Sequence, residues 1–146
     1  MSGPLRILCV CSGNTCRSPM LKALLRAAVA NAHRAEVQVD SAGTGAVDGE
    51  PASLGAQRAM ERRGLSLADH AATNLRKIDL GAYRHFWCMT AGHAAAVRAL
   101  GIPAAQISVV NEGGGGVPDP FGGDDQEYEA TAQVLEMAAR EIAQDL

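Results

Sequence analysis

Short apolar runs alternate along this chain with segments of helical periodicity, and this alternation restricts the possible folds more than any other feature of the sequence. The expected strands are residues 6–10, 35–41, 86–89 and 107–110. The expected helices begin at residue 18 and then span 51–63, 74–78, 93–100 and 125–143. Strands separated by helices favour a parallel sheet covered on both faces. We therefore predict an α/β fold with a four-stranded parallel sheet and helices on both faces.

Chain length and charge agree with one compact domain over residues 1–146. A chain of this size can bury about two thirds of its unfolded surface. The formal net charge is −3 and the acidic and basic residues are interspersed, so neither nucleic acid nor a membrane is an expected partner. The N-terminal apolar run is too short for a secretory signal, which favours a cytoplasmic protein with reduced cysteines.

The first expected strand ends in a polar loop that leads into a helix, with the sequence Cys11-Ser12-Gly13-Asn14-Thr15-Cys16-Arg17-Ser18-Pro19. Backbone N–H groups at a helix start bind oxyanions and lower the pKa of a nearby thiol. Cys11 is therefore the candidate nucleophile toward a phosphoryl group held in the loop. Arg17 follows in the same loop and can donate two hydrogen bonds to phosphoryl oxygens, which stabilises the transition state.

A core role or a metal site accounts less well for the cysteines of this loop. Free cysteines are often buried, and Cys9, between Leu8 and Val10, is predicted to be a core residue. A core role does not account for the small and anion-pairing residues that follow Cys11. The cysteine spacing does not fit a zinc site, and no Gly-Lys-Ser/Thr triplet ends the loop as in P-loop nucleotide-binding proteins. Because Arg17 and the backbone supply the charge that a metal would, we expect no metal and no cofactor.

Residues 10–20 resemble the signature loop of the low-molecular-weight protein tyrosine phosphatase family. Two further stretches fit that family in the right order, with Asp69-His70 and Cys88-Met89-Thr90 between them: Asp40-Ser41-Ala42-Gly43-Thr44 and Pro118-Asp119-Pro120-Phe121-Gly122-Gly123. The resemblance therefore covers nearly the whole chain. It implies a metal-independent phosphatase of phosphorylated protein substrates that forms a phosphocysteine and releases inorganic phosphate. Its phosphate-binding loop would comprise Ser12, Gly13, Asn14, Thr15, Cys16 and Ser18.

Asp119 is the candidate general acid. When a thiolate attacks phosphorus the leaving group has to be protonated, and the same carboxyl group can later accept a proton from the attacking water. Pro120 biases Asp119 toward an extended backbone. Because Pro-Asp-Pro also forms ordinary turns, the acid role depends on the combination with the Cys11 loop. Asp124 and Asp125 lie nearer the start of the last helix and are predicted to cap it.

The resemblance also assigns two residues to the support of the loop. In this family a serine and a histidine from elsewhere hold the asparagine and the serine of the loop, here Asn14 and Ser18. The two holding residues would be Ser41 and His70, which would keep the loop donors preorganised. Without the family, His70 also fits a surface turn or a helix cap, and Ser41 fits a strand end.

Cys16 has two interpretations that the sequence leaves open. It could form a reversible disulfide with Cys11 and so protect the nucleophile from irreversible oxidation. It could equally be a small buried side chain beneath the loop.

The phosphorylated side chain of the substrate is predicted from positions where this chain differs from the family members that act on phosphotyrosine. Members acting on phosphotyrosine tend to carry a bulky aliphatic residue where this chain has Thr15 and a second aromatic residue where it has Gly122. Thr15 and the run from Asp119 through Phe121 instead resemble the bacterial protein arginine phosphatase branch. We expect Thr15 and Phe121 to set selectivity, favouring phosphoarginine, with phosphotyrosine as the alternative. Lys22 also departs from the family, where an acidic residue is common at this position.

The sequence supports two other classes of function less well. Arsenate reductases share the fold and the loop, but they need a resolving pair of cysteines downstream, where this chain has only Cys88 in an apolar run. A non-enzymatic phosphate-binding role does not explain why Cys11, Arg17 and Asp119 occur together.

Overall fold

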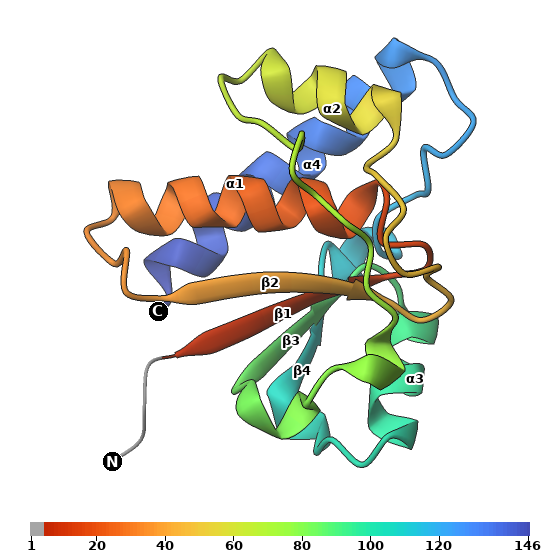
Figure 1. The fold of residues 1–146 in the computed structure, drawn as a ribbon. Helices are drawn as coiled ribbons and strands as arrows, with labels where there is room; N and C mark the ends of the chain where they lie inside the picture. The colour runs from red at the N-terminus through yellow and green to blue at the C-terminus, as the bar shows by residue number, and fades with distance from the viewer. Residues whose placement is uncertain (1–4) are drawn as a thin grey trace.

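The four expected strands form one parallel sheet in the computed structural model, which describes residues 5–146. The strands are β1 (Arg6–Cys11), β2 (Gln38–Gly43), β3 (His85–Cys88) and β4 (Ile107–Val109). Their order across the sheet is β2-β1-β3-β4, and every neighbouring pair is parallel (Figure 1). The carboxyl ends of all the strands therefore lie at the same edge of the sheet.

Helices cover both faces of this sheet, as predicted. The α-helices are α1 (Arg17–Asn31), α2 (Leu54–Glu61), α3 (Ala91–Ala99) and α4 (Asp125–Gln144). Figure 1 places α1 and α4 on one face, with α2 packed farther out beside them, and α3 on the opposite face. The predicted fold class is therefore confirmed.

The central strand β1 is buried on both faces, which explains its nearly continuous apolar sequence. Ile7 and Cys9 belong to the core between the sheet and α1, α2 and α4. Leu8 and Val10 point to the other face and pack in a second core with Phe86. Cys9 is fully buried, as predicted for a core thiol, and burial raises its pKa.

The start of α1 differs from the prediction. The helix begins at Arg17 and Cys16 occupies the N-cap position, with no hydrogen bond from its side chain to the helix. Ser18, where this helix was expected to begin, lies inside the first turn and is fully buried. Its hydroxyl group contacts the loop side chains instead of the helix backbone, because the loop turns back over the helix start.

Other element boundaries shift by a few residues. The strand expected over 35–41 is observed as β2, which starts later in the chain. Its pairing with β1 begins where Gln38 lies opposite Arg6. The helix expected over 51–63 is the shorter α2, since Ser53 caps it. Thr90 caps α3 in the same way. Asp124 caps α4 through a capping box, as predicted for the carboxylates near that helix start.

The glycines at 113–116 form a compact hydrogen-bonded turn. A 3-10 helix spans Glu112–Gly114, and the carbonyl oxygen of Asn111 accepts hydrogen bonds from the N–H groups of Gly114 and Gly116. The next residue, Val117, donates its N–H to the Met89 carbonyl oxygen. These bonds fix where the chain leaves the sheet and turns toward Asp119. Within residues 5–146, no helix is long and apolar enough to cross a membrane.

Gly43, the last residue of β2, is needed for the close approach of this strand to the loop after β1. A Cβ atom there would overlap the Ser12 carbonyl oxygen and lie 2.9 Å from the Asn14 nitrogen, and both are backbone atoms that cannot rotate away. We expect Gly43→Ala to lower the free energy of unfolding by about 1–3 kcal/mol, as for other overpacked sites, measured by urea denaturation.

Gly45→Ala is the matched control, because a Cβ atom there meets no heavy atom closer than 4.0 Å. A Gly43→Ala protein as stable as this control would show that the strand and the loop are not in tight contact.

Candidate active site

A loop, Ser12–Cys16, connects the end of β1 to the start of α1 and forms the base of the site. Asn14 adopts the left-handed conformation with φ of 56°, which asparagine tolerates better than most residues. The N–H groups of Thr44 and Gly45 donate to the carbonyl oxygens of Cys11 and Ser12, so the segment after β2 holds the loop from one side. The first turn of α1 contains no acidic residue, so its positive dipole end is uncompensated there.

A pocket of about 250 Å³ opens above this loop. Three segments that lie far apart in the sequence line it. The lining residues are Cys11, Gly13, Thr15, Cys16 and Arg17 from the loop, Gly45, Val47 and Glu50 after β2, and Asp119 and Phe121 after β4. Ser12, Asn14, Ser18, Ser41 and His70 do not line the pocket.

The Cys11 sulfur is almost completely buried at the bottom of this pocket. Burial raises the pKa of the thiol above its ordinary value. Four contacts act in the opposite direction: the Ser18 hydroxyl, the backbone N–H groups of Ser18 and Asn14, and the charge of Arg17. The loop contacts therefore lower this pKa, as predicted, but the desolvation that comes with burial raises it by more.

A buried amide orders the side chains around that sulfur. The Asn14 amide nitrogen donates to the hydroxyl oxygens of Ser18, at 2.8 Å, and of Ser41, at 2.9 Å, while its side-chain oxygen accepts the N–H of Thr73 at 2.9 Å. Because Ser18 accepts from Asn14, its own proton can go either to the Cys11 sulfur, 2.9 Å away, or to the Ala42 carbonyl oxygen, 3.4 Å away. The expected partnership of Asn14, Ser18 and Ser41 is present in the structure.

His70 supports the same loop through its backbone. Its Nε2 lies 2.6 Å from the Asn14 carbonyl oxygen, and the Lys22 ammonium lies 3.3 Å from its Nδ1. An ammonium group can only donate, so Nδ1 accepts and Nε2–H donates to Asn14. Burial, with a further effect of Lys22, lowers the pKa of His70, and the neutral imidazole therefore holds the loop. The surface-turn interpretation of His70 is wrong, because the residue is buried.

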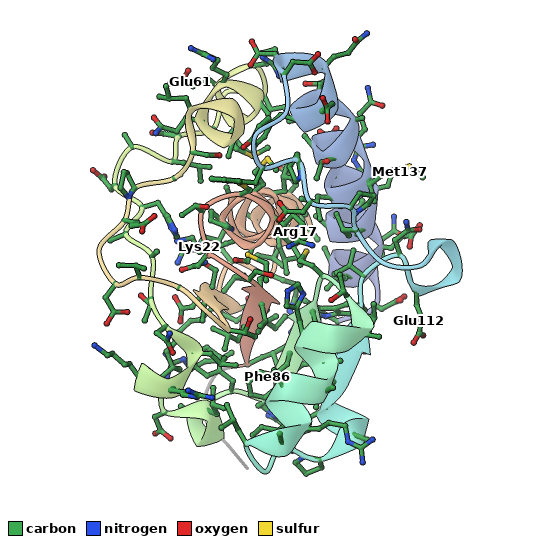
Figure 2. The ribbon with its side chains drawn as sticks, turned by 90° about the vertical axis from the view of Figure 1, so that its right-hand side faces the viewer. Arg17, Lys22, Glu61, Phe86, Glu112 and Met137 are labelled. Carbon is green, nitrogen blue, oxygen red and sulfur yellow. The ribbon has the colours of Figure 1, made fainter. Side chains whose placement is uncertain are left out.

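Arg17 connects the loop to the segment after β4. Its side chain is 5% exposed, Nη1 donates to the Val117 carbonyl oxygen at 3.0 Å, and Nη2 lies 3.5 Å from the Asp119 carboxylate. Its buried Nε–H has no hydrogen-bond partner among residues 5–146. Figure 2 shows Arg17 in the middle of the view, at the end of α1 that faces the viewer. A buried donor without a partner at the edge of a pocket suits an oxyanion, which would satisfy it.

Asp119 reaches the pocket from a half-exposed position. One carboxylate oxygen accepts the N–H of Phe121 at 3.1 Å, and the other faces Arg17. The carboxyl group therefore shares the pocket with Cys11 and has access both to a bound group and to water. Phe121 and Thr15, the two residues expected to set selectivity, line the same pocket.

Sequence reasoning missed His93, which was expected only to begin a helix. Its Nε2 lies 2.8 Å from the Ser12 hydroxyl and its Nδ1 lies 3.0 Å from the Thr90 hydroxyl, so α3 also holds the loop. Burial lowers the pKa of His93 to about 4, with Arg17 adding to the shift. No local pattern could have found this contact, because the ring meets Ser12 only after the two segments fold together.

Cys16 is the last residue of the loop and lines the pocket, with its sulfur 3.2 Å from the Ser53 hydroxyl and 3.4 Å from the Tyr128 hydroxyl. Burial raises the pKa of Tyr128 to about 12, so its hydroxyl stays protonated. The sulfur is 4% exposed and free, as the buried-side-chain interpretation expects, and the disulfide with Cys11 stays a prediction. Within residues 5–146, no cluster of histidine, cysteine or acidic side chains could hold a metal ion.

Comparison with known proteins places the whole described chain in one group. A family model for low molecular weight phosphotyrosine protein phosphatase matches residues 6–146. The chain is 36% identical to a protein-arginine-phosphatase of Geobacillus stearothermophilus, covering 98% of this chain and 97% of that protein. It is 34% identical to a low molecular weight protein-tyrosine-phosphatase of Streptomyces coelicolor, covering 92% of this chain and 88% of that protein.

The fold is shared with a solved structure of the YwlE arginine phosphatase. That structure is a cysteine-to-serine mutant with a phosphorylated active-site serine, and it matches with a TM-score of 0.88 at 31% identity. The match covers 97% of this chain and 95% of that one.

Protonation of His93 should cost stability in acid. Its pKa of about 4 in the folded protein lies below the ordinary value of 6.5, so the unfolded chain binds this proton more tightly, and stability falls as the pH drops through that interval. We expect His93→Gln to lose less free energy of unfolding than the wild type between about pH 7 and about pH 5, measured by urea denaturation.

His33→Asn is the control, because His33 is exposed and asparagine tolerates its left-handed backbone. This control should keep the pH dependence of the wild type. An unchanged pH dependence in His93→Gln would mean that His93 is not held neutral by its surroundings.

Proposed function

The chain belongs to the low molecular weight phosphotyrosine protein phosphatase family, and from that premise we propose that it hydrolyses phosphoarginine in proteins, using Cys11, Arg17 and Asp119. As a member of this family it is a phosphoprotein phosphatase, and its substrates are phosphorylated proteins. The three proposed catalytic residues come from two segments, Cys11 and Arg17 from the loop between β1 and α1 and Asp119 from the segment after β4, and all three line one pocket, which supports a shared role.

In the first step the Cys11 thiolate attacks phosphorus and forms a sulfur–phosphorus bond. The phosphorus–nitrogen bond of phosphoarginine breaks, and the Asp119 carboxyl group donates its proton to the departing guanidine nitrogen. Arg17 and the N–H groups of the loop bind the phosphoryl oxygens, where negative charge is spread in the transition state. The phosphorylated serine in the YwlE mutant supports a covalent phosphoenzyme in this family.

In the second step water attacks the phosphocysteine. The Asp119 carboxylate takes a proton from this water as the sulfur–phosphorus bond breaks, which releases inorganic phosphate and restores the thiolate. The Ser18 hydroxyl lies 2.9 Å from the sulfur and can donate to it, so it stabilises the leaving thiolate. Because burial opposes ionisation of Cys11, we expect the rate of the first step to rise with pH through the pKa of this thiol.

The residues that line the pocket support phosphoarginine as the substrate. Thr15 places a small hydroxyl group at the pocket wall, and the carboxylates of Glu50 and Asp119 line the same space. A guanidine leaving group is polar and becomes cationic on protonation, so hydroxyl and carboxylate partners suit it. Phe121 is the one aromatic residue in this lining, which offers a phenol ring few partners. The relative from Geobacillus stearothermophilus, named for arginine, agrees with this choice.

Phosphotyrosine is the second candidate. The family description and the relative from Streptomyces coelicolor both refer to tyrosine, and Phe121 stands at the pocket where a phenol ring could stack. Arsenate reduction is not supported, because Cys88 is fully buried in the core and burial raises its pKa to about 12. A thiol in that state is a poor partner for exchange.

We also propose a cytoplasmic location. The mechanism needs Cys11 as a free thiol, and the four cysteines of the described residues are free. A reducing compartment preserves this state.

Thr15→Ile tests the substrate assignment. The larger alkyl group removes a hydroxyl partner for guanidine and offers packing for a ring, so we expect kcat/KM for phosphoarginine relative to phosphotyrosine peptides to fall about tenfold or more. The wild type should prefer phosphoarginine, and Cys11→Ser should be inactive on both peptides. A wild-type preference for phosphotyrosine, or an unchanged ratio in Thr15→Ile, would contradict the assignment.

Asp119→Asn tests the acid role. With a poor leaving group we expect kcat/KM to fall by about 10²–10⁴-fold, because the departing atom then lacks its proton. An activated aryl phosphate leaves without protonation and should lose much less. Steady-state rates on a series of aryl phosphates measure the difference, and equal losses across the series would exclude Asp119 as the acid.

A further inference from the structure

Large apolar side chains are exposed around the mouth of the catalytic pocket. Val47 is 62% exposed, Leu54 65% and Phe121 70%. Among residues 5–146 the other exposed large apolar side chains are Leu100, Met137 and Leu146. Exposed apolar residues that gather in one place mark a contact surface more often than those that stand alone.

A second hollow begins where the catalytic pocket ends. It measures about 790 Å³ and lies between the first turn of α2, with Leu54 and Arg58, and the segment from Phe121 to Gln126 that leads into α4. Phe121 lines both spaces, so the hollow continues from the catalytic pocket at this side chain. We call this second hollow the α2–α4 groove.

Packing beneath the α2–α4 groove keeps it open and fixed. Gly55 lies directly against the ring of Tyr128, where a Cβ atom would overlap the ring, so α2 packs closely onto α4. The Tyr128 hydroxyl in turn contacts the Cys16 sulfur in the catalytic loop. The floor of the groove is therefore tied to the same loop that forms the base of the catalytic pocket.

Charge and polarity in the groove suit a polypeptide. Arg58 and Asp125 form an ion pair at 3.6 Å, and both side chains are more than half exposed, so they can reorient toward an incoming chain. Leu54 and Phe121 supply exposed apolar contacts in this groove, and Phe121 also lines the catalytic pocket. Polar and charged groups at the rim and apolar anchors at the centre are typical of surfaces that bind proteins.

We propose that the α2–α4 groove binds the substrate polypeptide next to its phosphorylated residue, with an apolar side chain of that segment packed between Leu54 and Phe121. This inference rests on the proposed function, because the phosphorylated residue has to occupy the catalytic pocket. Continuity through Phe121 identifies the occupant: a chain whose phosphorylated residue enters the pocket has its neighbouring residues at the groove. A small aryl phosphate does not extend that far.

Paired phosphopeptides with leucine or glycine beside the phosphorylated residue test the inference. The wild type should hydrolyse the leucine peptide with kcat/KM about tenfold higher, the gain expected for partial burial of one apolar side chain. Leu54→Ser should abolish this preference and leave kcat/KM for an aryl phosphate unchanged. Met137→Ser is the matched control, because Met137 is 62% exposed on the outer side of α4 (Figure 2) and should keep the preference.

Two sets of peptides, phosphoarginine and phosphotyrosine, separate this inference from the proposed function. The preference is read in whichever set is hydrolysed faster, so a wrong substrate assignment still leaves the groove tested. A preference that survives in Leu54→Ser overturns the inference, as does an equal loss on peptide and aryl phosphate. Sedimentation of the wild type as a dimer that Leu54→Ser dissociates would assign the groove to a second copy of the chain and would also overturn it.

Discussion

The buried side chain of Asn14 is the contact on which the rest of the site depends. This residue adopts the left-handed backbone conformation within the loop. Its side-chain amide forms hydrogen bonds of 2.8–2.9 Å with Ser18, Ser41 and Thr73. Every donor and acceptor of a fully buried amide has to be satisfied, since an unmet one costs about 1–3 kcal/mol. The amide thereby joins the loop to β2 through Ser41 and to the segment between α2 and β3 through Thr73, and it holds the Ser18 hydroxyl beside Cys11.

The electrostatics of the site follow from that ordered loop. Burial raises the pKa of Cys11, while Ser18, two backbone N–H groups and Arg17 stabilise its thiolate. The same burial lowers the pKa of His70 and His93, so both rings hold the loop as neutral partners. Because the two rings are neutral, the positive charge that lines the pocket comes from Arg17. In the proposed mechanism this charge acts on the bound phosphoryl group.

Sequence reasoning succeeded where local pattern and physics agree. Alternating strands and helices predicted the parallel sheet and its covering on both faces, because burial of apolar faces leaves few other arrangements. It failed at the start of α1, where Ser18 looks like a cap but serves the loop. It predicted the loop contacts that lower the Cys11 pKa but not the burial that raises it, because the depth of burial cannot be known from neighbours in the chain.

The sequence by itself determined the chemistry available to this protein: a thiol, a guanidinium and a carboxylate in a fixed order, with turn residues around them. Only the tertiary structure decided which groups meet those residues. His93 reaches Ser12 from α3, Lys22 sets the tautomer of His70, and Leu54 comes to the groove that Phe121 shares with the catalytic pocket. These contacts join residues far apart in the chain, and such proximity arises from the packing of whole elements, which no local stretch of sequence encodes.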